Sequence, residues 1–454
     1  MQSWITEELC EVGLGDERLN QRYAVLLERL ENQPSLSIPG SCKGWAETQA
    51  AYRFLSNPKV SREKILFPHI QATKQRMKSH PVVLCVEDTT FINFEGQRET
   101  PGLGPHTSTL EYGYFLHPLL AMTPEKLCLG TLHTHTWIRD NKFGKRYERA
   151  KKPIEEKESQ RWIDGYRETC NIQKQMKDTR LVYIADRESD IYELFVEGIT
   201  GEANWLIRAV RDRKTLETNK IREELANETS LGSLTLKLSH RKKRKRREAN
   251  LKIFAKQLSL LGPNRYRLGR LPNVTVTAIL AIEENPPAGE EPIDWLLITD
   301  MEVNSLEEAL EKLQWYSCRW QIEIFFFTLK SGCQIEKLQL ETLGRLESAV
   351  ALYMIVAWRL LYIKMLHKKL PEISCDFIFE KEEWQVIYFI INKKPPPKTP
   401  PLLSEMVNML AKLGGYLNRK NDSPPGIKTL WRGIQRARDL VSGYMAAKNM
   451  PETS

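Results

Sequence analysis

Hydrophobic and polar positions along the chain follow two periods, and the change between them divides the sequence. In residues 19–32 the apolar positions recur every three or four residues, as on one face of a helix, and a second such stretch covers 44–57. From residue 81 onward the apolar positions form short β-branched runs, which are typical of buried strands. These runs occupy 81–88, 114–123, 126–137 and 179–186, and the short connections in the first part predict an antiparallel meander. We therefore predict a helical module at 1–65 and a domain of α/β class at 66–368.

The pattern changes again towards the C-terminus. Short apolar segments separated by turn residues at about 206–294 predict an all-β insertion in the α/β domain. Residues 305–334 show a long helical pattern, and 348–363 form the most apolar stretch of the chain. That stretch is shorter than a bilayer span and contains Arg359, so we expect a buried helix rather than a membrane segment. Residues 369–454 predict a helical C-terminal domain.

Composition narrows the class of protein without deciding it. The 454 residues include 41% hydrophobic and 28% charged residues, which is typical of a folded soluble protein. Lys and Arg number 67 against 58 Asp and Glu, and the resulting charge of +9 fits an acidic partner such as nucleic acid or simply a basic soluble protein. The eight cysteines form no CxxC pair and the N-terminus is polar and acidic. We therefore expect reduced thiols and a cytoplasmic protein without a signal peptide.

Two of the expected strands end in aspartate. Asp88 closes the run 81–88, and Asp186 closes the run 179–186. A carboxylate at the end of a strand lies at the rim of the sheet, where a site can be built, and its oxygens suit Mg²⁺ or Mn²⁺. The alternative is structural, because aspartate often caps a following helix and the residues after Asp186 predict one.

A third element carries polar groups at helical spacing. Tyr316, Arg319, Glu323 and Lys330 are separated by three, four and seven residues, so on a continuous helix they fall within about 60° of one another. Apolar residues occupy the other side, which can pack on the sheet. An exposed salt-bridged face would explain the charges. It would not explain Trp320, a large aromatic residue that flanks the polar face.

These residue types suit the cutting of a phosphodiester bond. Two metal ions about 3.5–4 Å apart can activate an attacking oxygen and stabilise the leaving oxygen. Three carboxylates suffice to hold such ions, and Asp88, Asp186 and Glu323 are the candidates. The two basic residues of the helix face can bind phosphates beside the scissile bond, and its tyrosine can donate a hydrogen bond to another.

Longer segments of the sequence carry a resemblance to a known family. The segments are LGDERLNQR, AAYRFLSNPKVS, EDTT at 87–90, EKES at 156–159, ADRESDIY at 185–192, ENPPAGEEPIDWLLIT at 284–299 and YSCRWQIEIFFFTLKSG at 316–332. With the complete Tyr-x2-Arg-x3-Glu-x6-Lys signature, they resemble the DDE transposases of the insertion-sequence-four family, in the branch that contains the transposase of transposon five. LGGYLNRKND and LWRGIQRARDLVSGYMAAKNM extend the resemblance nearly to the C-terminus.

The resemblance implies a ribonuclease-H-like catalytic core, with the β insertion between the second aspartate and the glutamate. It implies Asp88, Asp186 and Glu323 as the triad that holds two Mg²⁺ or Mn²⁺ ions per active site. Members of the family nick a transposon end, form and open a DNA hairpin, and join the end to target DNA. The tryptophans that stack on a flipped base in the family match Trp295 and Trp320, although ordinary core packing is an alternative for Trp295.

The same resemblance sets expectations for the terminal domains and the partners. The N-terminal module would bind DNA ends, with Arg22 and Arg53 at matching positions and surface arginines as the alternative. A basic position of the family is Asn32 in this chain, which departs from the family pattern. The C-terminal helices would form a homodimer that bridges two ends in a synaptic complex, with cleavage in trans. The implied partners are double-stranded transposon ends and target DNA in the bacterial cytoplasm, at the nucleoid, and no membrane.

A histidine pair and a basic run each have a functional and a purely structural interpretation. His133 and His135 could suggest a metal pair, but without a third ligand nearby we interpret them as surface residues of a strand. The basic run 240–248 could bind DNA non-specifically or form a solvated loop of the insertion.

Two other functions compete with transposition. One is a catalytically silent DNA-binding regulator of transposition, and the other is a metal-dependent nuclease without joining activity. The complete triad and signature argue against the regulator, since binding alone needs neither. The N-terminal recognition module and the C-terminal helices favour transposition over simple cutting.

Overall fold

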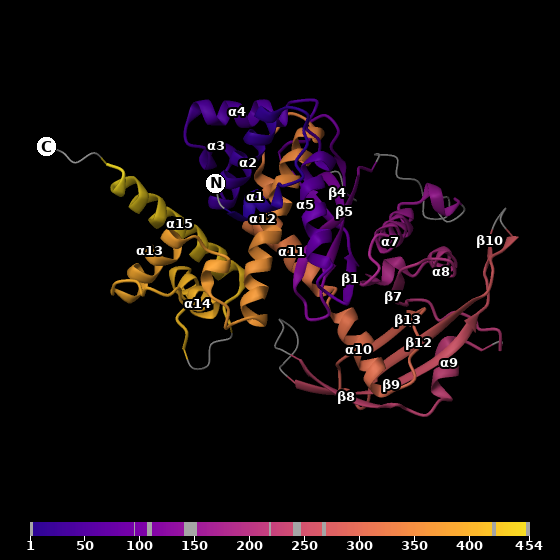
Figure 1. The fold of residues 1–454 in the computed structure, drawn as a ribbon. Coiled ribbons are helices and arrows are strands. Elements are labelled where there is room, and N and C mark those ends of the chain that lie inside the picture. The colour runs from indigo at the N-terminus through magenta and orange to yellow at the C-terminus, as the bar shows by residue number, and fades with distance from the viewer. Residues whose placement is uncertain are drawn as a thin grey trace.

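The computed structural model describes residues 3–94, 96–106, 111–139, 152–217, 219–238, 247–265, 269–419 and 424–450. It is a mixed α/β structure built around one large sheet. Figure 1 shows that the N-terminal and C-terminal helices gather around α12 at one end of the molecule, while the last strands of the sheet extend away from them at the other.

A cluster of helices precedes the first strand, which confirms the helical pattern of residues 1–65. The helices are α1 (Ser3–Glu8), α2 (Glu17–Asn32), α3 (Ile38–Ser41), α4 (Trp45–Leu55) and α5 (Arg62–Met77). Asp16 caps α2 and Ser61 caps α5, because each side chain accepts a hydrogen bond from a backbone N–H of the first turn. α5 continues past residue 65 and packs against β5 (Cys128–Trp137), so the N-terminal helices and the sheet share one long element.

The central part of the sheet contains the strands that the apolar runs predict. They are β1 (Val82–Glu87), β2 (Thr90–Asn93), β3 (Gly104–Pro105), β4 (Tyr112–Met122), β5, β6 (Arg180–Ala185) and β7 (Asn204–Arg208). β4 pairs antiparallel with both β1 and β5, which confirms the predicted meander. β6 lies parallel to β1, and β7 lies parallel to β6. α7 (Gln160–Gln173) packs against β1 and β6, which explains why their sequences are continuous apolar runs.

Most strands of the predicted insertion continue the central sheet, and two short ones pair with each other in a separate two-stranded sheet. The strands of the insertion are β8 (Gly232–Leu238), β9 (Arg247–Leu260), β10 (Asn264–Arg265), β11 (Gly269–Arg270), β12 (Val274–Glu283) and β13 (Asp294–Thr299). β13 pairs antiparallel with β7, and the sheet runs on through β12, β9 and β8. The segment is not all-β as expected, because Ile221–Ala226 forms α9, which packs against β9 and β12. α8 (Tyr192–Gly198) lies before the insertion, after a single 3₁₀ turn at Arg187–Ser189.

Helices form the rest of the chain. They are α10 (Leu306–Ser317), α11 (Trp320–Phe327), α12 (Leu343–Lys369), α13 (Lys381–Asn392), α14 (Leu403–Leu413) and α15 (Ile427–Lys448). Short helical turns occur at Ile154–Glu156, Ile335–Lys337 and Cys375–Phe377. In the part of the chain that the structure describes, α12 is the one helix long and apolar enough to cross a membrane, and 83% of its most apolar window is buried. This confirms the prediction of a buried core helix.

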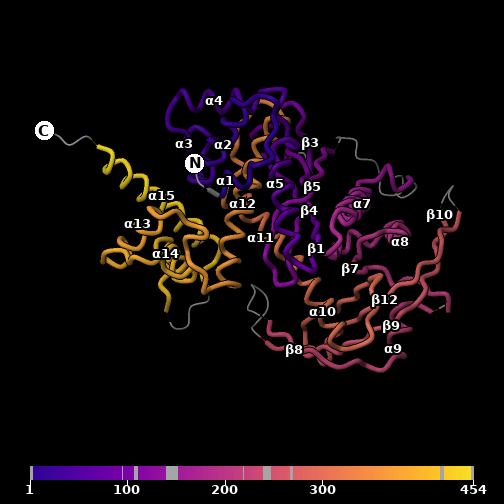
Figure 2. The backbone as a smooth tube through the Cα atoms, viewed as in Figure 1, coloured from indigo at the N-terminus to yellow at the C-terminus, as the bar shows by residue number. Residues whose placement is uncertain are grey.

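The two ends of the chain meet beside α12. α15 runs next to the N-terminal helices in Figures 1 and 2, and Arg438 of α15 donates hydrogen bonds to the backbone and side chain of Glu31 in α2. Both side chains are buried, and Arg438 also lies 3.7 Å from Glu383 of α13. Gln435 adds a 3.1 Å hydrogen bond to Gln33. A buried, charged contact therefore joins the N-terminal and C-terminal helices.

Candidate active site

The two predicted aspartates lie side by side at one edge of the sheet. β1 and β6 are adjacent parallel strands with Val86 opposite Ile184, and extending that register by two residues places Asp88 opposite Asp186. Each carboxylate is held by the loop that follows it. The backbone N–H of Thr89 donates to Asp88 Oδ1 at 2.8 Å, and the N–H of Glu188 donates to Asp186 Oδ1 at 2.8 Å. Asp186 thus also caps the following 3₁₀ turn, as the structural alternative predicts.

Glu323 joins this edge through Arg319. The Arg319 guanidinium donates to Asp88 Oδ2 at 2.6 Å and to Glu323 Oε1 at 3.3 Å. Arg319 is only 8% exposed, whereas the Glu323 side chain is 44% exposed and open to a ligand. The structure therefore links two of the three predicted carboxylates through one buried arginine, and the third, Asp186, follows the adjacent strand β6.

Burial dominates the electrostatics of Asp88 in this cluster. Burial raises the pKa of the Asp88 carboxyl to about 6; Arg319 opposes this rise and the charge of Asp186 adds to it. The pKa of Arg319 is raised although burial lowers it, because the nearby carboxylates favour the charged guanidinium. A cation bound beside Asp88 would favour the charged carboxylate, as Arg319 already does.

The donor set fits a hard divalent cation. Carboxylate oxygens are the ligands that Mg²⁺ and Mn²⁺ prefer, and the cluster offers three carboxylates against one arginine. Among the described residues, no three His, Cys, Asp or Glu side chains converge closely enough to hold an ion as they stand. Arg319 lies between Asp88 and Glu323 and takes an oxygen of each, so a metal ion would compete with its guanidinium.

The segment that carries Glu323 is not the single helix predicted for 305–334. Hydrogen bonds from residue i+3 to residue i tighten the chain around Arg319, between α10 and α11. Thr328–Gly332 then form a π-helical turn that packs against α12. The four polar residues of the predicted helix therefore do not share one face. Tyr316 is buried close to Arg319, but Lys330 points to β2, where it donates to the Phe91 carbonyl and lies 3.3 Å from Glu336.

The two predicted stacking tryptophans differ in their surroundings. Trp320 is 43% exposed at the start of α11, and the Arg319 guanidinium lies 5.2 Å from the centre of its ring. Trp295 is half-buried on β13 and lines an open cavity of about 940 Å³ together with Arg187, Arg208 and other residues. Because Arg187 directly follows Asp186, this cavity adjoins the carboxylate edge. Base stacking by either tryptophan remains a prediction.

The remaining predicted positions lie away from the carboxylates. Arg22 is half-buried on α2, and Arg53 is exposed on α4, where it contacts Gln49 at 3.5 Å. His135 stacks on Trp137 of its own strand, with ring centroids 5.5 Å apart. Residues 239–246, which include most of the basic run, lie outside the described residues. Arg247 begins β9 and forms ion pairs with Glu283 and Glu290.

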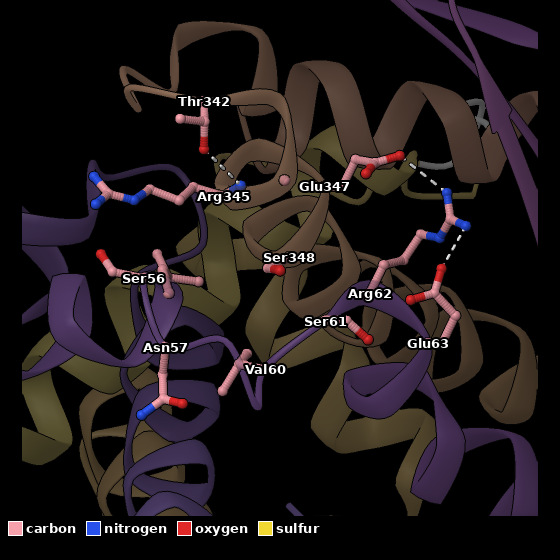
Figure 3. Close-up of a pocket in the computed structure, with 12 residues that line it drawn as sticks. Ser56, Asn57, Val60, Ser61, Arg62, Glu63, Thr342, Arg345, Glu347 and Ser348 are labelled. Atoms are coloured by element: carbon pink, nitrogen blue, oxygen red, sulfur yellow. Dashed lines mark hydrogen bonds and ion pairs between the residues drawn. The ribbon is translucent and has the colours of Figure 1, made fainter. Parts of the chain in front are cut away.

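A second cleft lies between the N-terminal helices and α12, and it does not suit a phosphate ligand. Figure 3 shows this cleft of about 260 Å³, lined by the α4–α5 turn and the start of α12. Arg62 binds Glu347 at 3.0 Å and Glu63 at 2.5 Å, and Arg345 pairs with Glu341. Because its arginines are paired with carboxylates, the cleft has little net positive charge to attract a phosphate.

Two buried residues beside the aspartates escaped the sequence analysis. Glu87, 1% exposed, accepts a 2.6 Å hydrogen bond from Tyr183 and lies 3.3 Å from His117. A Cβ at Gly165 would lie 2.2 Å from the Glu87 carboxylate, so glycine is required there. Arg161, 8% exposed, follows the EKES segment that resembles the transposases. The sequence signal for Arg161 was that proximity, but it indicated no role.

Three family models match successive parts of the chain. Residues 1–60 match the model of the transposase DNA-binding family, 160–359 match the transposase DDE domain, and 355–454 match the transposase Tn5 dimerisation domain. Among solved structures, the chain is similar to a cryo-EM structure of the piggyBac transposase synaptic complex with hairpin DNA. The identity is 9% and the TM-score 0.38, over 99% of this chain and 79% of that one.

Proposed function

Because the chain belongs to the Tn5-like DDE transposases, we propose that it is a cut-and-paste enzyme that nicks transposon ends, forms and opens a DNA hairpin, and joins the end to target DNA. The observation that carries the proposal is the link from Asp88 through Arg319 to Glu323, at the edge where Asp186 also lies. The strand order β5–β4–β1–β6–β7 supports a ribonuclease-H-like core.

Asp88, Asp186 and Glu323 would hold the divalent ions, which we propose to be two Mg²⁺ or Mn²⁺. When bound, such ions activate an attacking oxygen and stabilise the leaving oxygen in phosphodiester chemistry. The chain itself orients the DNA. Arg319 can exchange a carboxylate partner for a phosphate oxygen, because its planar guanidinium binds either with two parallel hydrogen bonds. Lys330, which donates to the Phe91 carbonyl and is paired with Glu336, would exchange these partners for a phosphate of the bound strand.

The cavity beside Trp295 and the exposed ring of Trp320 would receive a base unpaired from the DNA end. Stacking on an aromatic ring stabilises an extruded base by about 1–3 kcal/mol. The cavity is also lined by Asp294 and Glu290, but these are paired with Arg222 and Arg247, so Arg187 and Arg208 would supply positive charge for the flanking phosphates. The N-terminal helices with Arg22 and Arg53 would bind the end sequences, and the C-terminal helices would join two copies in a synaptic complex.

Replacing Trp320 by alanine is expected to reduce hairpin formation about tenfold or more, while the first nick is retained. The reason is that the nick needs no extruded base, whereas the hairpin does. Hairpin and nicked products can be separated on a denaturing gel, with 2-aminopurine fluorescence reporting the unstacked base. Phe67→Ala, at an exposed aromatic of α5, serves as the control. Equal losses of nick and hairpin in Trp320→Ala would contradict the assignment.

The proposed function is tested with purified protein, Mg²⁺, DNA that flanks the gene on each side, and a target plasmid. We expect cut ends, a hairpin intermediate and joined product. Cut ends without joined product would leave a metal-dependent nuclease. Binding without any cutting would leave a DNA-binding regulator.

A further inference from the structure

Arg161 connects the two loops that follow the catalytic strands. It is the second residue of α7, and it is 8% exposed. Its Nε donates to Thr89 Oγ1 at 3.2 Å, and its Nη2 donates to Glu188 Oε2 at 2.6 Å. Thr89 follows Asp88 directly, and Glu188 comes two residues after Asp186. One side chain therefore spans the gap between the loops of β1 and β6.

Both loop residues in turn hold an aspartate. The backbone N–H of Thr89 and that of Glu188 each donate to their aspartate at 2.8 Å. The Thr89 hydroxyl also lies 2.8 Å from Nδ1 of the buried His117, so it is fixed from a second side. Displacement of Arg161 would thus be passed on to Asp88 and Asp186 through one residue in each loop.

The guanidinium of Arg161 is itself held in place. Its Nη1 donates to the Glu158 carbonyl at 2.6 Å. Its central carbon lies 4.9 Å from the ring centre of Trp137 and 5.2 Å from that of Trp162. Arginine suits this position because its rigid fork can donate in several fixed directions at once, which the single ammonium of lysine cannot do.

We propose that Arg161 is a positioning residue that fixes the spacing of Asp88 and Asp186 and so prepares them to bind divalent ions. The inference rests on the proposed function, because it assumes that these carboxylates are metal ligands. A side chain that only anchored α7 to the sheet would affect folding but not metal affinity in a folded protein. Metal affinity and stability therefore have to be measured on the same variants.

The test compares the full-length chain with its Arg161→Gln and Arg161→Lys variants. The control is Arg167→Gln, on the same helix, where the arginine pairs with Glu197 and Asp164 away from both loops. Mn²⁺ binding is measured by electron paramagnetic resonance, beside the thermal unfolding midpoint. We expect Mn²⁺ affinity to fall about 10–100-fold in Arg161→Gln, as is usual for residues that support metal ligands. Arg161→Lys should lose less, and the control should match the wild type.

A double-mutant cycle identifies the route of the effect. Glu188→Gln keeps the backbone N–H that holds Asp186 but weakens the partner of Arg161. If Arg161 acts through Glu188, the loss of Mn²⁺ affinity caused by Arg161→Gln should be smaller in the Glu188→Gln background. Strictly additive losses in affinity would overturn the proposed route through this loop.

The outcomes separate this inference from the proposed function. Wild-type protein that binds Mn²⁺, together with folded Arg161 variants of equal affinity, would overturn the inference alone. Wild-type protein that binds no Mn²⁺ would overturn both. If Arg161→Gln fails to fold, Arg161→Lys decides, because an unchanged affinity in that variant overturns the inference and a weakened one in a folded protein supports it.

Discussion

Alanine at Glu323 is expected to abolish strand cleavage at a transposon end while end binding is retained. The change removes one of three carboxylates and leaves Arg319 bound to Asp88 alone. The loss of a metal ligand costs several kcal/mol of transition-state stabilisation, which corresponds to about a thousandfold or more in rate. DNA contacts of the N-terminal helices do not involve Glu323, so the affinity for ends should change little.

The measurement is end cleavage in Mg²⁺ beside a gel-shift titration with the same DNA. Glu307→Ala is the matched control, since Glu307 is an exposed glutamate on the preceding helix. Glu307→Ala should cleave as the wild type does. Cleavage that survives in Glu323→Ala would refute the assignment of the triad.

Methionine at Arg438 is expected to lower the free energy of unfolding by about 3–5 kcal/mol. The change would leave Glu31 buried without its charged partner, and breaking one side of a buried ion pair carries a penalty of that size. Glu383, whose pKa is raised by burial, would lose a neighbouring cation as well. Urea unfolding followed by circular dichroism measures the effect.

The companion variants decide whether the unpaired charge is the cause. Arg432→Met, at an exposed position of α15, should change stability by less than about 0.5 kcal/mol. The double variant Glu31→Leu with Arg438→Met removes both charges and should recover most of the loss. A double variant as unstable as Arg438→Met would show that packing, not charge, accounts for the destabilisation.

The sequence predicted those parts of the fold in which a single segment carries its own signal. β1 and β6 are mostly apolar runs that lead to Asp88 and Asp186, because strands buried on both faces have few polar positions until they leave the sheet. α12 was predictable for a related reason, since its length and apolarity leave few alternatives. Part of the candidate site was predictable because both aspartates lie directly at the ends of such strands.

Long-range pairing and local distortions of helices were not predictable in this way. The junction of β7 with β13 joins residues that lie far apart in the chain, and apolar alternation is the same whichever strand is the partner. The tightened turn at Arg319 and the π-helical turn at Thr328–Gly332 leave the residue spacing unchanged but rotate Lys330 away from Glu323. Arg161 lies just after the EKES segment, but the sequence could not show its burial, which depends partly on Trp137 of β5.

The position of β13 between β7 and β12 also sets an order on the folding of the nascent chain. β7 ends at Arg208, but the strand that covers its edge begins only at Asp294. At about 5–20 residues per second, the ribosome needs on the order of ten seconds to deliver it. During that time the edge of β7 exposes unpaired backbone groups, to which another chain could add a strand. Nascent chains on ribosomes that translate the same messenger RNA would therefore be most prone to aggregate in this interval, before β13 covers the edge of β7.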